Sequence, residues 1–408
     1  MPLITQLENK IEIERQKTSA LLKITNLING NFDIEDLLSQ YKVIMKDNVG
    51  VGKMIFVNHS IGWNHVLQFG AIKKYTTEDY KQLQHFNTLA CVQDLETNCF
   101  SEFDVFIPII HKEKALSYLL IGGIGVKNLK EYKDKHNDFI QTITNIISVA
   151  IENQSLNEEL INIRVAERDI ELAASMQKML FPRNLPHSTS VDVSATYIPK
   201  FMVSGDYYDF IRFSDTEYVF CIADVSGKGV SAALLMSNLQ ANFRANIKYN
   251  NRHLTLIDLV KELNYNVLDS AHGEKFITFF VGYFNEETRA LKYINAGHNY
   301  PILKDKSGIK ELKTGCTALG IFEEFPFLTS ETIILEPNTI IVCFTDGMTE
   351  VENETGEQFE TDRLAEAISA NSYLNMGEMN KAILKEIDDF KGENQFPDDT
   401  AILSIRII

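Results

Sequence analysis

The sequence predicts an α+β protein with three successive parts, and three observations support this fold class. The 408 residues suffice for two or three domains at roughly 100–200 residues each. Helical and strand-forming segments alternate over the first part, a helical apolar pattern then continues without Gly or Pro, and the remainder is rich in strands. We therefore expect an α/β domain over 1–150, a helical coiled-coil linker over 151–182 and a strand-rich domain over 183–408.

Composition and charge narrow the possible functions. The chain carries 39 Lys+Arg against 56 Asp+Glu, a net charge of −17, which argues against nucleic acid and anionic lipid as partners. The N-terminus has no apolar core of signal-peptide length, and the longest nearly apolar run, 115–126, is far shorter than the ~20 residues that span a bilayer. We therefore expect a soluble, cytoplasmic protein without membrane insertion.

The cysteines do not indicate disulfides or a zinc site. The chain has five of them, an odd number, and they are scattered without a CxxC pair. Cys221 and Cys343 lie inside apolar runs and are expected to be small core residues.

The first 150 residues predict helices before and after a central sheet. One helix is expected over 1–30, and a second begins after Asp33, a residue type that favours helix N-termini. The apolar, β-prone runs that follow are Lys53–Val57, Trp63–Phe69, Phe103–Ile110 and Leu116–Gly125. Helix resumes near Asp134, so this order fits one α/β domain.

The helix that begins near Asp134 does not end with this domain. From Ile146 to Gln177 the pattern repeats at alternating spacings of three and four, which is typical of a coiled-coil seam, although Asn153, Glu167 and Gln177 interrupt it. Pro182 ends the run. We expect a dimer stalk or signalling lever, and hence a homodimer. The alternative is a surface helix packed on its own domain.

The third part predicts a β-sandwich covered by helices. Tyr218–Ala223 and Ile340–Phe344 are continuous apolar runs, as expected for strands that are covered on both faces. Two further strands flank the turn at 285–288, and Ala401–Ile408 forms the last one. The expected helices are Ser231 to about Tyr249, Leu254 to about Leu268, and Met376 to Phe390.

Four acidic motifs each follow or begin an apolar strand. They are Ser204–Asp209, Ala223–Gly229, Phe344–Gly347 and Pro397–Thr400. A single Asp-Gly is usually only a turn, but a carboxylate at a buried strand end is costly unless it is paired or bound to metal. Converging carboxylates would make an oxygen-rich pocket suited to Mg²⁺ or Mn²⁺. Two such ions ~3.5–4 Å apart could bridge a water, lower its pKa and direct it at phosphorus.

Other motifs are weaker. Gly227-Lys228-Gly229 lacks both the glycine spacing and the Ser or Thr of a phosphate-binding loop. His298 follows a strand and is more simply a turn histidine that holds loops by hydrogen bonds. Because no Ser or Cys nucleophile motif is present, hydrolysis by a metal-activated water is favoured over a covalent intermediate.

Taken in order, these motifs resemble the PPM-type, metal-dependent Ser/Thr phosphatases of the protein phosphatase 2C class. The similar branch is the bacterial one with the sporulation stage II E phosphatase and regulators of sigma factors. The matching stretches are Ala173–Pro182, Gly205–Phe210, Ala223–Gly229, Asn295–His298, Phe344–Gly347 and Asp398–Asp399. This resemblance implies an α-β-β-α sandwich with two Mn²⁺ or Mg²⁺ ions at one end.

The resemblance also implies site roles. Asp206 would hold one metal, Asp224 would bridge both with help from the Val225 carbonyl, and Asp346 and Asp398 would complete the shell. Catalysis would depend on Asp206 and Asp224. The usual Asp-Asp-x-Thr of the family is altered here, which leaves Asp399 as an alternative ligand to Asp398. No arginine near the Gly205-Asp206 motif matches the phosphate-gripping arginine of eukaryotic members.

The N-terminal part is more loosely similar to GAF sensor domains. The similar stretches are Phe106–Ile110, Leu119–Gly123 and Val149–Asn153. The cyclic-nucleotide signature Asn-Lys-x-x-Phe-Asp-Glu is absent, so the signal is an unspecified small molecule or protein. Together, the resemblances imply a sensor-regulated phosphatase for phosphoserine and phosphothreonine, with a phosphorylated anti-sigma-factor antagonist as substrate. The alternatives are a catalytically inactive scaffold that binds a signalling partner, and a nucleotide cyclase.

Overall fold

The computed structural model describes all residues except 1, 31–32, 59–62, 64–65, 96, 98, 112–113, 125–128 and 250–254. These residues form two compact units, Met1–Val165 and Ala166–Ile408, called unit 1 and unit 2 below. Within the described chain, no helix has the length and apolarity needed to cross a membrane.

Unit 1 contains an antiparallel five-stranded sheet in the order β2-β1-β5-β4-β3. Its strands are β1 Lys53–Asn58, β2 Val66–Phe69, β3 Ala90–Cys91, β4 Val105–His111 and β5 Lys114–Gly122. The four strands expected from the sequence are confirmed with shifted ends. Asn64, His65 and Gly125, which were expected in strands, lie outside the described residues.

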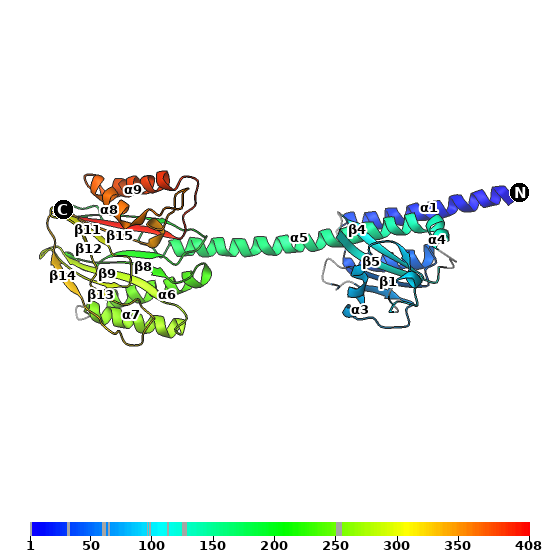
Figure 1. Cartoon of the computed structure of the whole chain (residues 1–408), viewed down its shortest axis with the longest axis horizontal. Helices are drawn as coiled ribbons and strands as arrows, with labels where there is room; N and C mark the ends of the chain where they lie inside the picture. Colours follow the sequence, from blue (N-terminus) through cyan, green and yellow to red (C-terminus); the bar gives the residue numbers. More distant parts are fainter. Residues whose placement is uncertain are drawn as a thin grey trace. The chain divides into compact units, whose positions relative to one another are not determined.

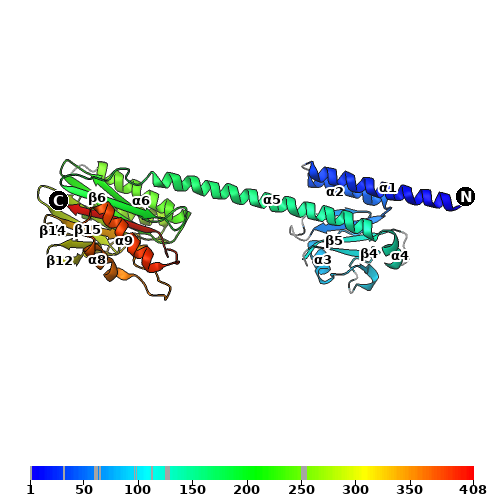
Figure 2. The ribbon, with the colours of Figure 1, turned by 90° about the horizontal axis from the view of Figure 1, so that it is seen from above.

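The two faces of this sheet are covered by different elements, because neighbouring residues of a strand point to opposite faces. Phe56 packs with α1, α2 and the start of α5, whereas Ile55 and Val57 pack in an aromatic cluster on the other face. Figure 2 shows α1 and α2 beside the sheet. The helices are α1 Pro2–Asn29, α2 Ile34–Val43 with a following π-helical turn Ile44–Asn48, α3 Thr77–Lys81, α4 Leu129–Lys135 and α5 Asn137–Lys178.

Helix α5 runs unbroken from unit 1 into unit 2, which confirms the predicted long helix. Its first turns bury Ile140 and Ile147 in the core of unit 1. Further along, Leu156, Leu160 and Ile163 of the predicted seam are about half exposed, at 48%, 50% and 48%. These exposed apolar side chains leave the coiled coil a prediction.

Unit 2 is built from two sheets. One has the order β13-β10-β9-β8-β7, with β14 also paired to β10, and the other has the order β12-β11-β15-β16-β6. The strands are β6 Val191–Ile198, β7 Tyr207–Arg212, β8 Glu217–Val225, β9 Ile277–Asn285, β10 Ala290–Ala296, β11 Ile302–Asp305, β12 Gly308–Glu311, β13 Gly315–Cys316, β14 Glu331–Ile334, β15 Thr339–Phe344 and β16 Thr400–Ile407. The predicted hairpin around 285–288 is confirmed by the antiparallel pairing of β9 and β10.

Helices cover both outer faces of the sandwich (Figure 1), as the α-β-β-α expectation required. They are α6 Val230–Tyr249 and α7 Leu256–Ala271 on the β8 sheet, and α8 Glu360–Ala370 and α9 Met376–Lys391 on the β15 sheet. In β15, Ile341 and Cys343 face the inter-sheet core, whereas Ile340 and Val342 pack against α8 and α9. Cys221 and Cys343 are fully buried, as predicted. Leu254, the expected start of α7, lies outside the described residues.

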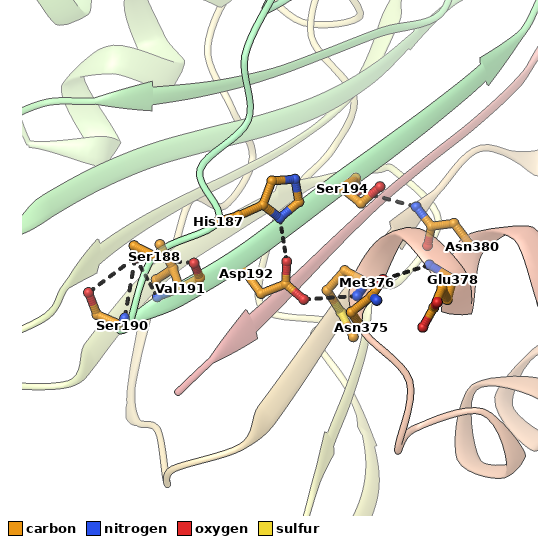
Figure 3. Close-up of polar contacts among 10 residues, drawn as sticks. All are labelled: His187, Ser188, Ser190, Val191, Asp192, Ser194, Asn375, Met376, Glu378 and Asn380. Carbon is orange, nitrogen blue, oxygen red and sulfur yellow. Dashed lines mark hydrogen bonds and ion pairs between the residues drawn. The ribbon is translucent and has the colours of Figure 1, made fainter.

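Polar contacts hold α9 on β6 (Figure 3). The Asp192 carboxylate accepts a hydrogen bond from the Met376 N–H at 2.9 Å and contacts Nδ1 of His187 at 2.6 Å. Asn375 caps the helix by accepting from the Glu378 N–H, and Asn380 donates to the Ser194 carbonyl at 3.3 Å. The first turn of α9 is therefore tied to the edge of the second sheet.

Candidate functional site

Asp206 lies immediately before β7 and is almost completely buried, at 2% exposure. Its Oδ2 has no hydrogen-bond partner among the described residues. Its backbone N–H donates to Oγ of Ser204 at 3.1 Å. Gly205 packs against the neighbouring strand, because an added Cβ would lie 3.0 Å from the Val225 carbonyl oxygen. A side chain at this position would require the Val225 backbone to shift by a few tenths of an ångström.

Asp224 and Val225 end strand β8, next to β7 in the same sheet. Tyr207 pairs with Ala223, so Asp206 and Asp224 follow as neighbours at the ends of the two strands. Val225 is 1% exposed. The predicted residues of the first sheet therefore meet at one end of the sandwich.

Asp346, Asp398 and Asp399 come from the second sheet, after β15 and before β16. The two connections touch, since an added Cβ at Gly347 would lie 2.0 Å from the Asp399 carbonyl oxygen. Both Asp399 carboxylate oxygens accept backbone hydrogen bonds, from Lys200 N–H at 2.8 Å and Gly205 N–H at 3.2 Å. Asp399 thereby joins the second sheet to the Asp206 loop.

Burial and mutual repulsion shift the acidities of these carboxyl groups. Burial, then the negative charge of Asp224, raises the pKa of Asp206 well above its ordinary value. Burial, then the charges of Asp346 and Asp398, raises the pKa of Asp224 to about 7. Burial, then Glu350 and Asp398, raises the pKa of Asp346. The predicted acidic residues therefore form one electrostatically linked group, called the acidic cluster below: Asp206, Asp224, Asp346, Asp398 and Asp399.

The donor chemistry of the acidic cluster fits a hard divalent cation. The donors are all oxygen, and the buried Oδ2 of Asp206 lacks a hydrogen bond within the described chain. A cation would also offset the repulsion that raises these pKa values. No set of three or more His, Cys, Asp or Glu side chains in the described part of the chain is arranged as a ready-made metal site.

The structure adds contacts that the motifs did not predict. Nζ of Lys228 lies 2.6 Å from Oδ2 of Asp398. Gln177, an irregular position of the predicted seam, bonds to the backbone of Ser204. The Gly-Lys-Gly motif drew attention to Lys228 for another reason, and no sequence signal pointed to the Gln177 contact.

His298 behaves as the hydrogen-bonded histidine that its turn motif suggested. Its backbone N–H donates to Oδ1 of Asn295 at 2.8 Å, and its Nδ1 lies 2.8 Å from Oγ1 of Thr278. Burial lowers the pKa of His298 to about 4. The side chain is therefore a neutral imidazole near pH 7.

Comparison with known proteins agrees with this geometry. Residues 214–408 match the family model of stage II sporulation protein E. The phosphoserine phosphatase RsbU of Bacillus subtilis is 29% identical over 290 residues, which cover 69% of this chain and 84% of RsbU. Protein IcfG of Synechocystis is 26% identical over 328 residues, 74% of this chain and 51% of IcfG. The phosphoserine phosphatase RsbP of Bacillus subtilis is 25% identical over 187 residues, 45% of each chain.

A solved structure shares the fold of unit 2. The PP2C domain of SiaA from Pseudomonas aeruginosa superposes with a TM-score of 0.54 at 19% identity, covering 60% of this chain and 99% of that domain. The family match and the named relatives therefore support a phosphatase domain of the SpoIIE/PP2C type in the C-terminal part of the chain, and the protein is a phosphoprotein phosphatase, a hydrolase.

Proposed function

We propose that this protein is a metal-dependent Ser/Thr protein phosphatase with its catalytic centre at the acidic cluster. The observation that carries the proposal is the convergence of Asp206 and Asp224 from one sheet with Asp346 and Asp398 from the other. Such a concentration of carboxylates at one rim, with raised pKa values for Asp206, Asp224 and Asp346, is expected of a functional site rather than of a structural one.

Two Mn²⁺ or Mg²⁺ ions would be held by Asp206, Asp224, Asp346 and Asp398, together with the Val225 carbonyl. We assign Asp398 rather than Asp399 to the metals, because the oxygens of Asp399 accept backbone N–H groups of two distant loop residues, whereas those of Asp398 accept the N–H of its own neighbour Asp399 and pair with the partly exposed Lys228. Divalent cations in such a site supply a nucleophile by lowering the pKa of water, and they neutralise charge on the phosphate. The carboxylates of the chain fix where that chemistry takes place.

The substrate that we propose is a phosphoserine or phosphothreonine protein. RsbU and RsbP are phosphoserine phosphatases, which supports this substrate class for the related chain. Within that class we propose a phosphorylated anti-sigma-factor antagonist, as the sequence resemblance implied.

Regulation is assigned to the N-terminal part. We propose a GAF-like sensor domain over 1–150 that receives a small-molecule or protein signal, and a linker over 151–182 that pairs in a homodimer. Two features support the linker role: α5 is continuous, and Gln177 near its end is buried against the Ser204 backbone. A shift of this helix would therefore displace the backbone of Ser204, the residue directly before the Gly205-Asp206 motif.

The test uses the full chain with a phosphoserine peptide and, separately, a phosphotyrosine peptide. We expect phosphate release from the phosphoserine peptide that requires Mn²⁺ or Mg²⁺ and stops in the presence of EDTA. Asp224→Asn should abolish it, while Asp215→Asn, which changes a solvent-exposed carboxylate, should not. Equal turnover by Asp224→Asn would overturn the site. Peptide binding without turnover by the metal-loaded wild type would favour the inactive scaffold.

A further inference from the structure

Two lysine side chains lie at the edge of the acidic cluster. Nζ of Lys228 is 2.6 Å from Oδ2 of Asp398 and 3.4 Å from the carbonyl oxygen of Pro397. Nζ of Lys200 donates to the same Pro397 carbonyl. Two ammonium groups that reach one oxygen are close neighbours, so this edge of an otherwise acidic site carries a local concentration of positive charge.

The backbone fixes both lysines at this edge. Lys228 lies between Gly227 and Gly229, whose φ angles of +91° and +73° are left-handed. An added Cβ at Gly229 would meet nothing within 4 Å, so the glycine is required by its left-handed backbone conformation and not by a lack of space. The backbone N–H of Lys200 is held by Asp399 at 2.8 Å. The side chain of Lys228 nevertheless reaches solvent, with 46% of its surface exposed.

The ammonium of Lys228 has capacity for a ligand. A lysine carries three N–H donors and no acceptor. Within the described chain, two protein acceptors engage this group, the Asp398 carboxylate and the Pro397 carbonyl. One donor is left to bind an anion without breaking the ion pair that orients the side chain.

A phosphate group that approaches the acidic cluster needs a positive charge such as that of Lys228. A phosphate monoester carries about two negative charges near neutral pH, and the carboxylates of the acidic cluster repel it. Among the described residues, Lys228 acts electrostatically on Asp346 as well as on Asp398. Lys200 and Lys228 are therefore positioned to offset the repulsion at the mouth of the site.

We propose that Lys228, assisted by Lys200, binds the phosphate group of the phosphoprotein substrate at the edge of the acidic cluster. The inference rests on the proposed phosphatase function and adds the side chains that recognise the phosphate. Lys228 contributes as a fixed point charge and a hydrogen-bond donor. It is assigned no proton transfer.

The test compares full-length Lys228→Met, Lys228→Arg and Lys200→Met with wild type. Lys310→Met is the matched control. Lys310 is an exposed lysine on β12, and like Lys228 it pairs with an aspartate, since its Nζ lies 3.2 Å from Oδ2 of Asp305. Binding of inorganic phosphate to the Mn²⁺-loaded protein is measured by calorimetry, without turnover. Mn²⁺ affinity, and KM and kcat for a phosphoserine peptide, are measured separately.

Loss of one charged hydrogen bond at a partly exposed position should weaken phosphate binding and raise KM by about tenfold in Lys228→Met. We expect kcat to change by less than about threefold, and Mn²⁺ affinity to stay equal or to increase, because a competing cation is removed from Asp398. Lys228→Arg should restore phosphate affinity to within about threefold of wild type. Lys200→Met should show a smaller loss, and Lys310→Met none.

Phosphate affinity and KM within twofold of wild type in Lys228→Met would overturn the proposal, as would a phosphate loss that only parallels a loss of Mn²⁺. If Lys228→Met does not fold, Lys200→Met decides on the same criteria. The two proposals fail separately. A wild type that binds phosphate through Lys228 but hydrolyses no phosphopeptide would refute the phosphatase function alone, whereas normal hydrolysis without dependence on either lysine would refute this inference alone.

Discussion

The side-chain amide of Gln177 bonds to both backbone polar groups of Ser204. Its Nε2 donates to the Ser204 carbonyl at 2.7 Å, and its Oε1 accepts from the Ser204 N–H at 3.1 Å. Ser204 in turn accepts from the Asp206 N–H through its hydroxyl. The last turn of α5 is thus linked to the Asp206 backbone through two residues, so the position of the helix bears directly on one proposed metal ligand.

Gln177→Met should test this link, because methionine keeps the length of the side chain and removes both hydrogen bonds. The buried Ser204 groups would be left unsatisfied, and we expect a loss of about 2–4 kcal/mol in the free energy of unfolding of unit 2. Mn²⁺ affinity should fall at least severalfold, since Asp206 is less firmly placed. Calorimetric Mn²⁺ titration and denaturant unfolding measure the two effects. Unchanged Mn²⁺ affinity would mean that the contact is only structural.

Asp398 and Asp399 should behave differently when each is replaced by asparagine. Asp398→Asn removes a proposed ligand and a like charge, so we expect at least a tenfold loss of Mn²⁺ affinity and little change in the stability of the metal-free protein. Asp399→Asn replaces an acceptor of two backbone N–H groups and should lower the free energy of unfolding by about 1–3 kcal/mol. The opposite pattern of effects would reverse the assignment of the ligand.

The pH dependence of stability should reveal His298. Its folded pKa of about 4 lies below the ordinary value of 6.5, so the unfolded chain binds a proton first as the pH falls. The stability from the neutral imidazole is present above about pH 6.5 and is lost towards pH 4, by at most about 3 kcal/mol. Asp224, with a raised pKa of about 7, acts in the opposite direction and stabilises the metal-free protein as the pH falls from about 7.

His298→Asn should therefore leave the stabilisation that comes from protonating the buried carboxylates unopposed as the pH falls. In EDTA, the variant should gain stability relative to wild type between pH 6.5 and pH 4.5, as measured by denaturant unfolding at each pH. Asparagine keeps a polar atom near Thr278, which lies 2.8 Å from Nδ1 of the imidazole. His272→Asn is the control, because His272 is exposed and in a left-handed conformation that asparagine tolerates. Parallel pH curves for His298→Asn and wild type would contradict the assignment.

The sequence predicted β8, β9, β10, β15 and β16 and the acidic positions of unit 2 because both depend on local order, whereas β7 and the short strands β11–β14 were not predicted. An apolar run that ends in Asp, as at Ala223-Asp224, signals a buried strand that delivers a carboxylate to its end. Helix α8 was not predicted, since within its 11 residues only Leu364, Ala367 and Ile368 are buried and its N-terminus has no side-chain cap.

The bonds that assemble the site could not be predicted, because they join residues far apart in the chain. Lys200 and Asp399 are 199 residues apart, and Gly205 and Asp399 are 194 apart. Gln177 illustrates the same limit: a glutamine in an apolar seam looks like an interruption until the Ser204 backbone is beside it. Periodicity identifies which face of an element is apolar, but it does not indicate which polar group of a distant segment will lie against that face.

The exposed seam of α5 predicts a homodimer that single charges can break. Leu160→Asp places a carboxylate at a half-exposed apolar position, and burial of each leucine contributes about 1.5–3 kcal/mol. Two copies per dimer should raise the dimer dissociation constant by about 100-fold or more. Sedimentation equilibrium measures it, and Asn157→Asp, an exposed position outside the seam, is the control. A wild type that is monomeric, or a variant as dimeric as Asn157→Asp, would argue against the seam.

Asp192 should contribute stability without contributing to catalysis. It accepts from the N–H of Met376 at the start of α9, where a negative charge also interacts favourably with the helix dipole. Along β6, Asp192 pairs with Arg406 and Ile198 with Thr400, so Asp192 lies roughly 20 Å from the acidic end of the strand at about 3.3 Å per residue.

Asp192→Ala should therefore lower the free energy of unfolding of unit 2 by about 1–3 kcal/mol, and Asp192→Asn by less, since the amide oxygen can still accept from Met376. Both variants should keep wild-type kcat and Mn²⁺ affinity below their unfolding temperature. Denaturant unfolding measures the stability, and peptide dephosphorylation at about 25 °C, well below unfolding, measures the catalytic rate. A fall in kcat in Asp192→Asn without loss of stability would mean that α9 communicates with the acidic cluster, because weaker contacts to the Met376 N–H and to His187 would otherwise show as lost stability.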